Sequence, residues 1–150
     1  MKGMFDASVA SEIKQRLGRL QPDSARQWGK MNAAQAVAHC AAGMEVALGD
    51  AKPARMLIGR ILGPIFKPIV IDSDRPMKPG APTAPDLVVK DERNLDKERA
   101  RLSGLIDRMQ TGGAKAVTTH PHQFFGALSP AQWAVLVYKH LDHHLRQFAV

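Results

Sequence analysis

Apolar residues recur at the three- and four-residue spacing of an amphipathic helix in four long stretches of this chain. The spacing predicts long helices over residues 6–20, 32–48, 93–110 and 129–148. A shorter helix is predicted over residues 53–62, and alternation typical of strands is almost absent. The pattern therefore predicts an all-α protein, a four-helix bundle that forms a single domain over residues 1–150.

A proline-rich segment, residues 63–91, interrupts the helical pattern. Its prolines are Pro64, Pro68, Pro76, Pro79, Pro82 and Pro85. Because proline lacks the backbone donor that a helix needs, we expect a long extended connection between the middle helices, with no continuous helix. The short apolar runs at residues 69–71 and 87–89 are interpreted as extended loop in preference to strands.

The last predicted helix carries two histidines on its apolar side. His140 and His144 are one turn apart and in line with Trp133 and Val137, whereas His143 falls outside that face. Two histidines at this spacing can converge on one metal ion. The alternative is a pair of hydrogen-bonded histidines in a helical core. Burial of two imidazoles is costly unless their nitrogens are satisfied, which raises the weight of the metal interpretation.

The second predicted helix, residues 32–48, is apolar on almost all sides and is therefore expected to be buried. Gln35 and His39 are among its few polar residues, and they lie one turn apart. We expect His39 to be buried and to have His140 and His144 as candidate partners. Gln35 is the residue that we expect to orient the His39 ring.

A loop before the last helix combines two histidines with two aromatic residues. His120, His122, Phe124 and Phe125 can line a pocket beside a metal site. Alternatively, the two Phe side chains close the end of the bundle while the histidines hydrogen-bond the loop. The sequence leaves both interpretations open.

The charge balance adds little about function. Lys and Arg outnumber Asp and Glu by 21 to 14, for a net charge of +7, which invites a nucleic-acid interpretation. These cations are scattered, aromatic residues are few and no nucleic-acid-binding motif is present, so a solvated basic surface is favoured and no nucleic-acid partner is expected.

The single cysteine, Cys40, fits a reducing compartment. No basic-then-apolar signal segment opens the chain, and the most apolar run, residues 61–71, is too short and too interrupted to span a bilayer. We therefore expect a cytoplasmic protein without a membrane partner.

Three segments resemble an uncharacterised bacterial branch of the DinB/YfiT-like superfamily: residues 28–40, residues 120–126 and residues 138–148, which carries the H-x-x-x-H pattern. The resemblance implies a four-helix bundle, commonly a homodimer. It also implies a divalent metal, often zinc or nickel, bound by one histidine of the second helix and two of the last. In this chain those positions are His39, His140 and His144.

The superfamily includes thiol S-transferases that use bacillithiol, mycothiol or glutathione, a maleylpyruvate isomerase and proposed hydrolases. Three neutral imidazoles would leave coordination positions open for a water or a thiolate. We therefore expect a metal-dependent enzyme with a small-molecule substrate, an S-transferase acting through a low-molecular-weight thiol. A metal-dependent hydrolase and a non-enzymatic bundle that binds a metal or a small ligand remain the alternatives.

Overall fold

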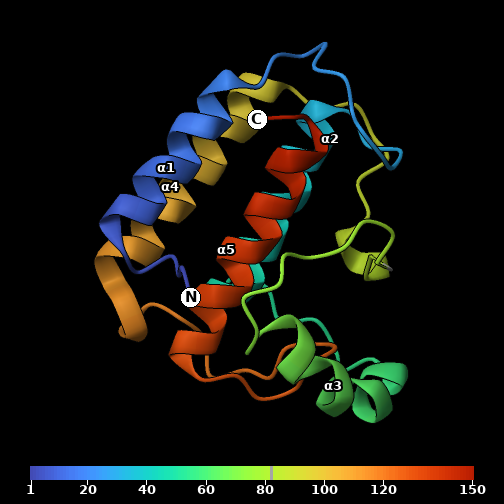
Figure 1. The fold of residues 1–150 in the computed structure, drawn as a ribbon, viewed down its shortest axis with the longest axis vertical. Helices are drawn as coiled ribbons and strands as arrows, with labels where there is room; N and C mark the ends of the chain where they lie inside the picture. Colours follow the sequence, from blue (N-terminus) through green and yellow to red (C-terminus); the bar gives the residue numbers. More distant parts are fainter. Residues whose placement is uncertain (82) are drawn as a thin grey trace.

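The computed structural model describes residues 1–81 and 83–150, and there the chain is helical (Figure 1). The α-helices are α1 (Ala7–Arg19), α2 (Ala33–Leu48), α3 (Leu57–Val70), α4 (Leu95–Gly112) and α5 (Pro130–Gln147). Two 3₁₀ helices, η1 (Pro85–Leu87) and η2 (Gly113–Lys115), complete the elements. Over these ranges there is no strand, only an isolated bridge between His122 and Gly126. The all-α prediction is confirmed, and Pro82 lies outside the described residues.

Four helices enclose the core. α2 packs against α4 and α5, and α1 packs against the same two helices (Figure 1). Alanines cover much of α2, and Ala33, Ala41 and Ala47 are completely buried, so neighbouring helices can approach it closely. α3 lies apart from these four, beside the loop that precedes α5 (Figure 1).

Capping boxes set the first turns of α2 and α5. Asn32 accepts from the backbone N–H of Gln35, whose side chain accepts from the backbone N–H of Asn32. Ser129 and Gln132 form the same reciprocal pair at the start of α5. These caps pair backbone N–H groups of the first turn and fix where each helix begins.

The third helix differs from its prediction. It begins at Leu57 and continues to Val70, through Pro64 and Pro68, so the predicted stop at residue 62 and the extended path for residues 69–70 were wrong. The two prolines are one turn apart and both are exposed. The carbonyls that lose a partner, those of Arg60 and Pro64, therefore lie towards the solvent side of the helix, where water can replace the missing donor.

Over its described residues, the connection that remains between α3 and α4 is non-helical apart from η1, as predicted. It runs along α2 and α5 and is held by side chains of both helices. The buried Lys139 ammonium donates to the carbonyls of Val70 and Ser73, and Gln35 Nε2 donates to the carbonyl of Asp91. Among the described residues, no helix combines the length and apolar character needed to cross a membrane.

Candidate metal site

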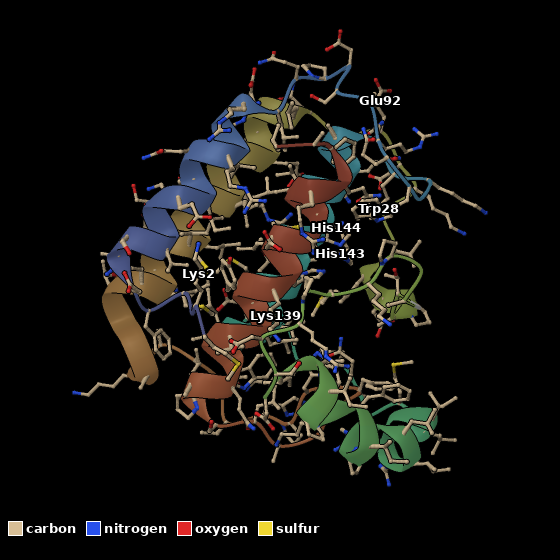
Figure 2. The ribbon with its side chains drawn as sticks, viewed as in Figure 1. Lys2, Trp28, Glu92, Lys139, His143 and His144 are labelled. Atoms are coloured by element: carbon tan, nitrogen blue, oxygen red, sulfur yellow. The ribbon has the colours of Figure 1, made fainter. Side chains whose placement is uncertain are left out.

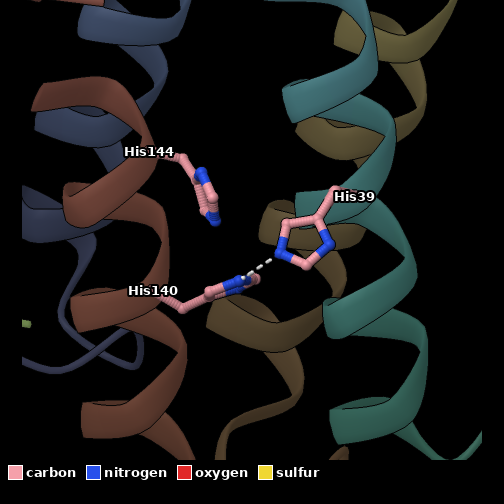
Figure 3. Close-up of side chains that lie close together, drawn as sticks. All are labelled: His39, His140 and His144. Carbon is pink, nitrogen blue, oxygen red and sulfur yellow. Dashed lines mark hydrogen bonds between the residues drawn. The ribbon is translucent and has the colours of Figure 1, made fainter. Parts of the chain in front are cut away.

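Three histidine rings meet between α2 and α5 (Figure 3). The ring centroid of His39 lies 4.7 Å from the ring centroid of His140 and 4.7 Å from that of His144. The centroids of His140 and His144 are 4.8 Å apart. The Nε2 atoms of His39 and His140 are 2.8 Å apart. One nitrogen from each ring lies within 4.8 Å of the others, so this group can hold a metal ion. The structure thus brings together the three residues singled out from the sequence.

A glycine on α2 makes room for the His140 ring. Gly43 lies one turn after His39, and a Cβ atom at this position would stand 3.1 Å from His140 Cε1 and 3.3 Å from its Nδ1. These distances are shorter than ordinary van der Waals contacts between carbon atoms. An alanine at residue 43 would therefore push the ring away from its present position.

The carbonyl of Leu87 orients the His39 ring. Its oxygen lies 2.8 Å from His39 Nδ1, and because a carbonyl can only accept, Nδ1 carries the proton. The Nε2 atom of the neutral ring then keeps its lone pair and faces His140. Gln35, expected in this role, instead bonds Asn32 and Asp91. The orienting group was missed because it is a backbone atom 48 residues away in the sequence.

A buried glutamine orients the His144 ring. Gln147 Oε1 accepts from His144 Nδ1 at 2.8 Å, while Gln147 Nε2 donates to the carbonyl of Trp28, also at 2.8 Å. Because the Trp28 carbonyl can only accept, it fixes which end of the amide faces His144. His144 Nδ1 is therefore the donor, and its Nε2 lone pair is free. The i, i+3 spacing of His144 and Gln147 was the available sequence signal.

Burial keeps all three rings neutral. Desolvation lowers the pKa of His39, lowers that of His140 well below its usual value, and lowers the pKa of His144 to about 3. Neutral imidazole is also the form that ligates metals. Without an ion, His140 can donate its Nε2 proton to His39, so an ion at these nitrogens and this hydrogen bond exclude each other.

The donor set fits a divalent transition metal that prefers nitrogen ligands, such as zinc or nickel. Three neutral histidines are present, and two of them donate their second nitrogen to an oxygen acceptor. Such outer hydrogen bonds fix the tautomer and ring orientation of metal-bound histidines in general. The described groups of the cluster include no carboxylate or thiol.

Cys40, next to His39 in the sequence, is fully buried and burial raises its pKa. It therefore stays a thiol and packs as a small residue of the core.

The loop histidines and phenylalanines make other contacts. His122 Nδ1 accepts hydrogen bonds from the backbone N–H groups of Phe124 and Phe125. The ring centroids of His122 and Trp133 are 5.5 Å apart. His120 Nε2 lies 3.3 Å from the carbonyl of Pro53. Phe125 packs against the core, and the ring centroid of Phe124 lies 6.5 Å from that of Phe66 in α3. These contacts match the interpretation in which the loop closes one end of the helices.

Two residues beside the group were not predicted to belong there. The ring centroid of His143 lies 5.0 Å from that of His144 and 5.4 Å from that of Trp28. The three side chains are labelled in Figure 2. His143 Nδ1 is 3.3 Å from the carbonyl of Met77, in the connection between α3 and α4. The helical pattern places His143 off the ligand face, yet His143 and Trp28 together flank the histidine group.

A protein-family model matches almost the whole chain. The model of a family described as "Protein of unknown function (DUF1569)" matches residues 5–150, and the chain belongs to this family. Comparisons with curated proteins and with solved structures found no match. The matched region includes all three histidines of the cluster and Gln147.

Proposed function

We propose that this DUF1569 chain is a divalent-metal-dependent enzyme whose ligands are His39, His140 and His144. One observation carries the proposal: His39 and His144 each donate Nδ1–H to an oxygen, which leaves their Nε2 lone pairs for the space that they share with His140. A single histidine in a core needs only hydrogen-bond partners for its own two ring nitrogens, with no second or third histidine beside it. Two rings held in this way, with His140 beside them, support zinc or nickel binding.

A bound ion would act as a Lewis acid with open positions and would lower the pKa of a water or thiol placed there. The residues of this chain orient the ligands and restrict solvent. The connection between α3 and α4 covers His39 through Leu87, and Trp28 lies beside His143.

His143 is the candidate proton acceptor next to the ligands. Its Nδ1 donates to the Met77 carbonyl, which leaves the lone pair on Nε2. Burial lowers the pKa of His143, so the ring is neutral at pH 7 and able to accept a proton.

For the reaction, we favour transfer to or from a low-molecular-weight thiol over hydrolysis. The net charge of +7 favours thiol cofactors that carry carboxylates, and the resemblance to the DinB/YfiT-like superfamily points in the same direction. That resemblance also supports a four-helix-bundle assignment for α1, α2, α4 and α5, a homodimer, a small-molecule substrate and a cytoplasmic location. Hydrolysis is the second candidate, because the same site can hold water.

Metal content tests the site. Untagged protein is loaded with zinc or nickel, desalted and analysed for metal by elemental analysis. We expect about one ion per chain for wild type and a residual amount for His140→Ala. His120→Ala removes a histidine outside the cluster and should keep the wild-type content. Equal, negligible metal in wild type and His140→Ala would reject the site.

Turnover tests the reaction. Metal-loaded protein is given a generic electrophile with and without glutathione, bacillithiol or mycothiol, and the assay is repeated with His144→Ala. Thiol-dependent turnover that is lost in His144→Ala supports the transferase. Thiol-independent ester or amide cleavage that is lost in the same variant supports the hydrolase instead. If neither reaction occurs in protein shown to hold metal, a binding role replaces the enzyme proposal.

A further inference from the structure

Helix α3 contacts the rest of the protein through its glycines. Gly59 and Gly63 are its only buried residues, and they lie on the backbone of the loop that carries Phe124. A Cβ atom at Gly59 would stand 2.7 Å from Phe124 Cα, and one at Gly63 would overlap the Phe124 carbonyl oxygen. The glycines permit this close approach, and the large side chains of the helix point elsewhere.

Those large side chains face outward. At about 100° per residue, the side of the helix opposite Gly63 carries Leu57, Ile58, Ile61, Ile65 and Ile69. Phe66 lies nearer to Gly63, and its ring is paired with that of Phe124. The exposed fractions of these side chains are high: Leu57 79 %, Ile61 72 %, Ile65 59 %, Ile58 54 %, Ile69 49 % and Phe66 42 %. Among the described residues, the other large apolar side chains exposed to this degree are Met1 and Val88. The five on α3 that lie opposite Gly63 are called the α3 apolar face below.

The apolar face is contiguous, whereas exposed apolar side chains on a soluble protein are usually scattered. Covering an aliphatic side chain of this size contributes about 1.5–3 kcal/mol, so an occupant would gain several such contributions. The helix is already fixed from its other side, where Lys67 Nζ donates to the carbonyl of Ala127. Its outward face therefore requires an occupant other than the core of this chain.

Charge distinguishes between the occupants. Helix α3 contains Arg60 and Lys67 and no Asp or Glu. Residues 51–81, which include the helix, hold six Lys or Arg and two Asp. A symmetric contact between two copies would place this basic segment against itself, with no carboxylate on the helix to balance it. An anionic lipid surface offers both an apolar layer and negative charge.

We propose that α3 lies in the interface of an anionic membrane, with its apolar face among the acyl chains and Arg60 near the headgroups. The helix has 14 residues, a length of about 21 Å, which suits a position in the plane of the membrane. The sequence-based expectation of no membrane partner rested on the lack of a spanning segment. A helix that lies on a membrane needs no such segment, so the proposal revises that expectation.

Vesicle co-sedimentation tests the proposal with the full chain. Vesicles of phosphatidylcholine alone are compared with vesicles that also contain phosphatidylglycerol, at low and high salt. We expect binding to the anionic vesicles that weakens with salt. Ile61→Gln/Ile65→Gln leaves the charge unchanged and should lower the partition coefficient about 100-fold or more. Arg60→Gln should lower it about fivefold.

Matched controls are Val88→Gln, an exposed apolar residue outside α3, and Arg19→Gln, an exposed cation at the end of α1. Both should bind like wild type, and circular dichroism should show that all variants keep their helix content. Equal binding to neutral and anionic vesicles, or unchanged binding of the double Ile variant, would overturn the proposal. So would a dimer, measured by light scattering, that the double Ile variant dissociates while wild type binds no vesicles.

Discussion

The side chain of Gln147 accepts a hydrogen bond from Nδ1 of His144, at 2.8 Å, from a position that is 98 % buried. Its amide nitrogen holds the carbonyl of Trp28, so one side chain links the loop after α1 to the histidine cluster. Both ends of the amide are satisfied, and neither can be removed without leaving a buried partner unpaired. Gln147 is therefore expected to control how His144 presents its Nε2 atom.

Substitution of Gln147 by alanine should weaken metal binding about 10- to 100-fold, because the His144 ring loses the acceptor that fixes its tautomer. The affinity is measured by competition with a chromophoric chelator for zinc. Gln132→Ala, on the same helix, removes a capping glutamine far from the cluster and should leave the affinity unchanged. Equal affinities for the two variants would show that the Gln147 contact does not act on the metal.

The replacement of Gly43 by alanine should also weaken metal binding, through steric displacement of His140. The added Cβ would stand 3.1 Å from His140 Cε1, so the ring has to move by a few tenths of an ångström. Gly104→Ala is the control, since a Cβ at that position of α4 meets nothing within 4 Å. That variant should gain about 0.5–1 kcal/mol in the free energy of unfolding without a change in zinc affinity.

Gly63→Ala should detach or shift α3. The new Cβ would overlap the Phe124 carbonyl, and a backbone contact cannot yield as a flexible side chain can. We expect a loss of about 1–3 kcal/mol in the free energy of unfolding, measured with urea, and faster proteolysis within residues 57–70. Gly18→Ala in α1, where a Cβ has open space, should be neutral or stabilising. Protection of α3 equal to wild type would contradict the close-packing account.

The stability of the protein should fall in acid partly through His122. Burial lowers its pKa to about 4, whereas an unfolded histidine titrates near 6.5. The proton therefore prefers the unfolded chain. The stabilisation by neutral His122 is complete above about pH 6.5 and is lost as the pH falls towards 4, an effect of about 3 kcal/mol.

His122→Asn isolates this effect, because the Asn oxygen can accept from the same backbone N–H groups without titrating. Urea unfolding of both proteins is measured with a chelator from pH 7.5 to 4. The advantage of wild type over the variant should shrink by up to about 3 kcal/mol across that range. A constant difference would assign the acid sensitivity to other groups.

The long helices were predictable because they depend on helical periodicity, whereas the grouping of His39 with His140 and His144 also rested on burial and on a family resemblance. The spacing of His140 and His144 places both rings on one side of α5, and the apolar surroundings of His39 place it in the core. The four long helices begin and end within a few residues of their predictions. The capping boxes at Asn32 and Ser129 carry a recognisable local signature, which is why these starts agree.

The course of α3 and the groups that orient the histidines were not predictable in the same way. Pro64 and Pro68 argue against a helix on local grounds, and only the exposure of that side of the helix makes them tolerable. The orientation of α3 depends on the close contact of Gly59 and Gly63 with a loop some 60 residues later. From the sequence alone, the large apolar side chains of this helix would be expected to face the core.

His39 and His144 differ in how sensitive their orienting hydrogen bonds are to a single amino-acid substitution. The acceptor for His144 is a side chain, and a single codon change at Gln147 abolishes it. The acceptor for His39 is the backbone oxygen of Leu87, which every amino acid would supply at that position. Random substitution can therefore remove one orienting contact directly, whereas loss of the other requires an insertion, a deletion or a rerouting of the chain. A saturation library should thus show sharp intolerance at residue 147 and tolerance of other apolar residues at residue 87, whose side chain packs against the core, together with sensitivity to changes in loop length around it.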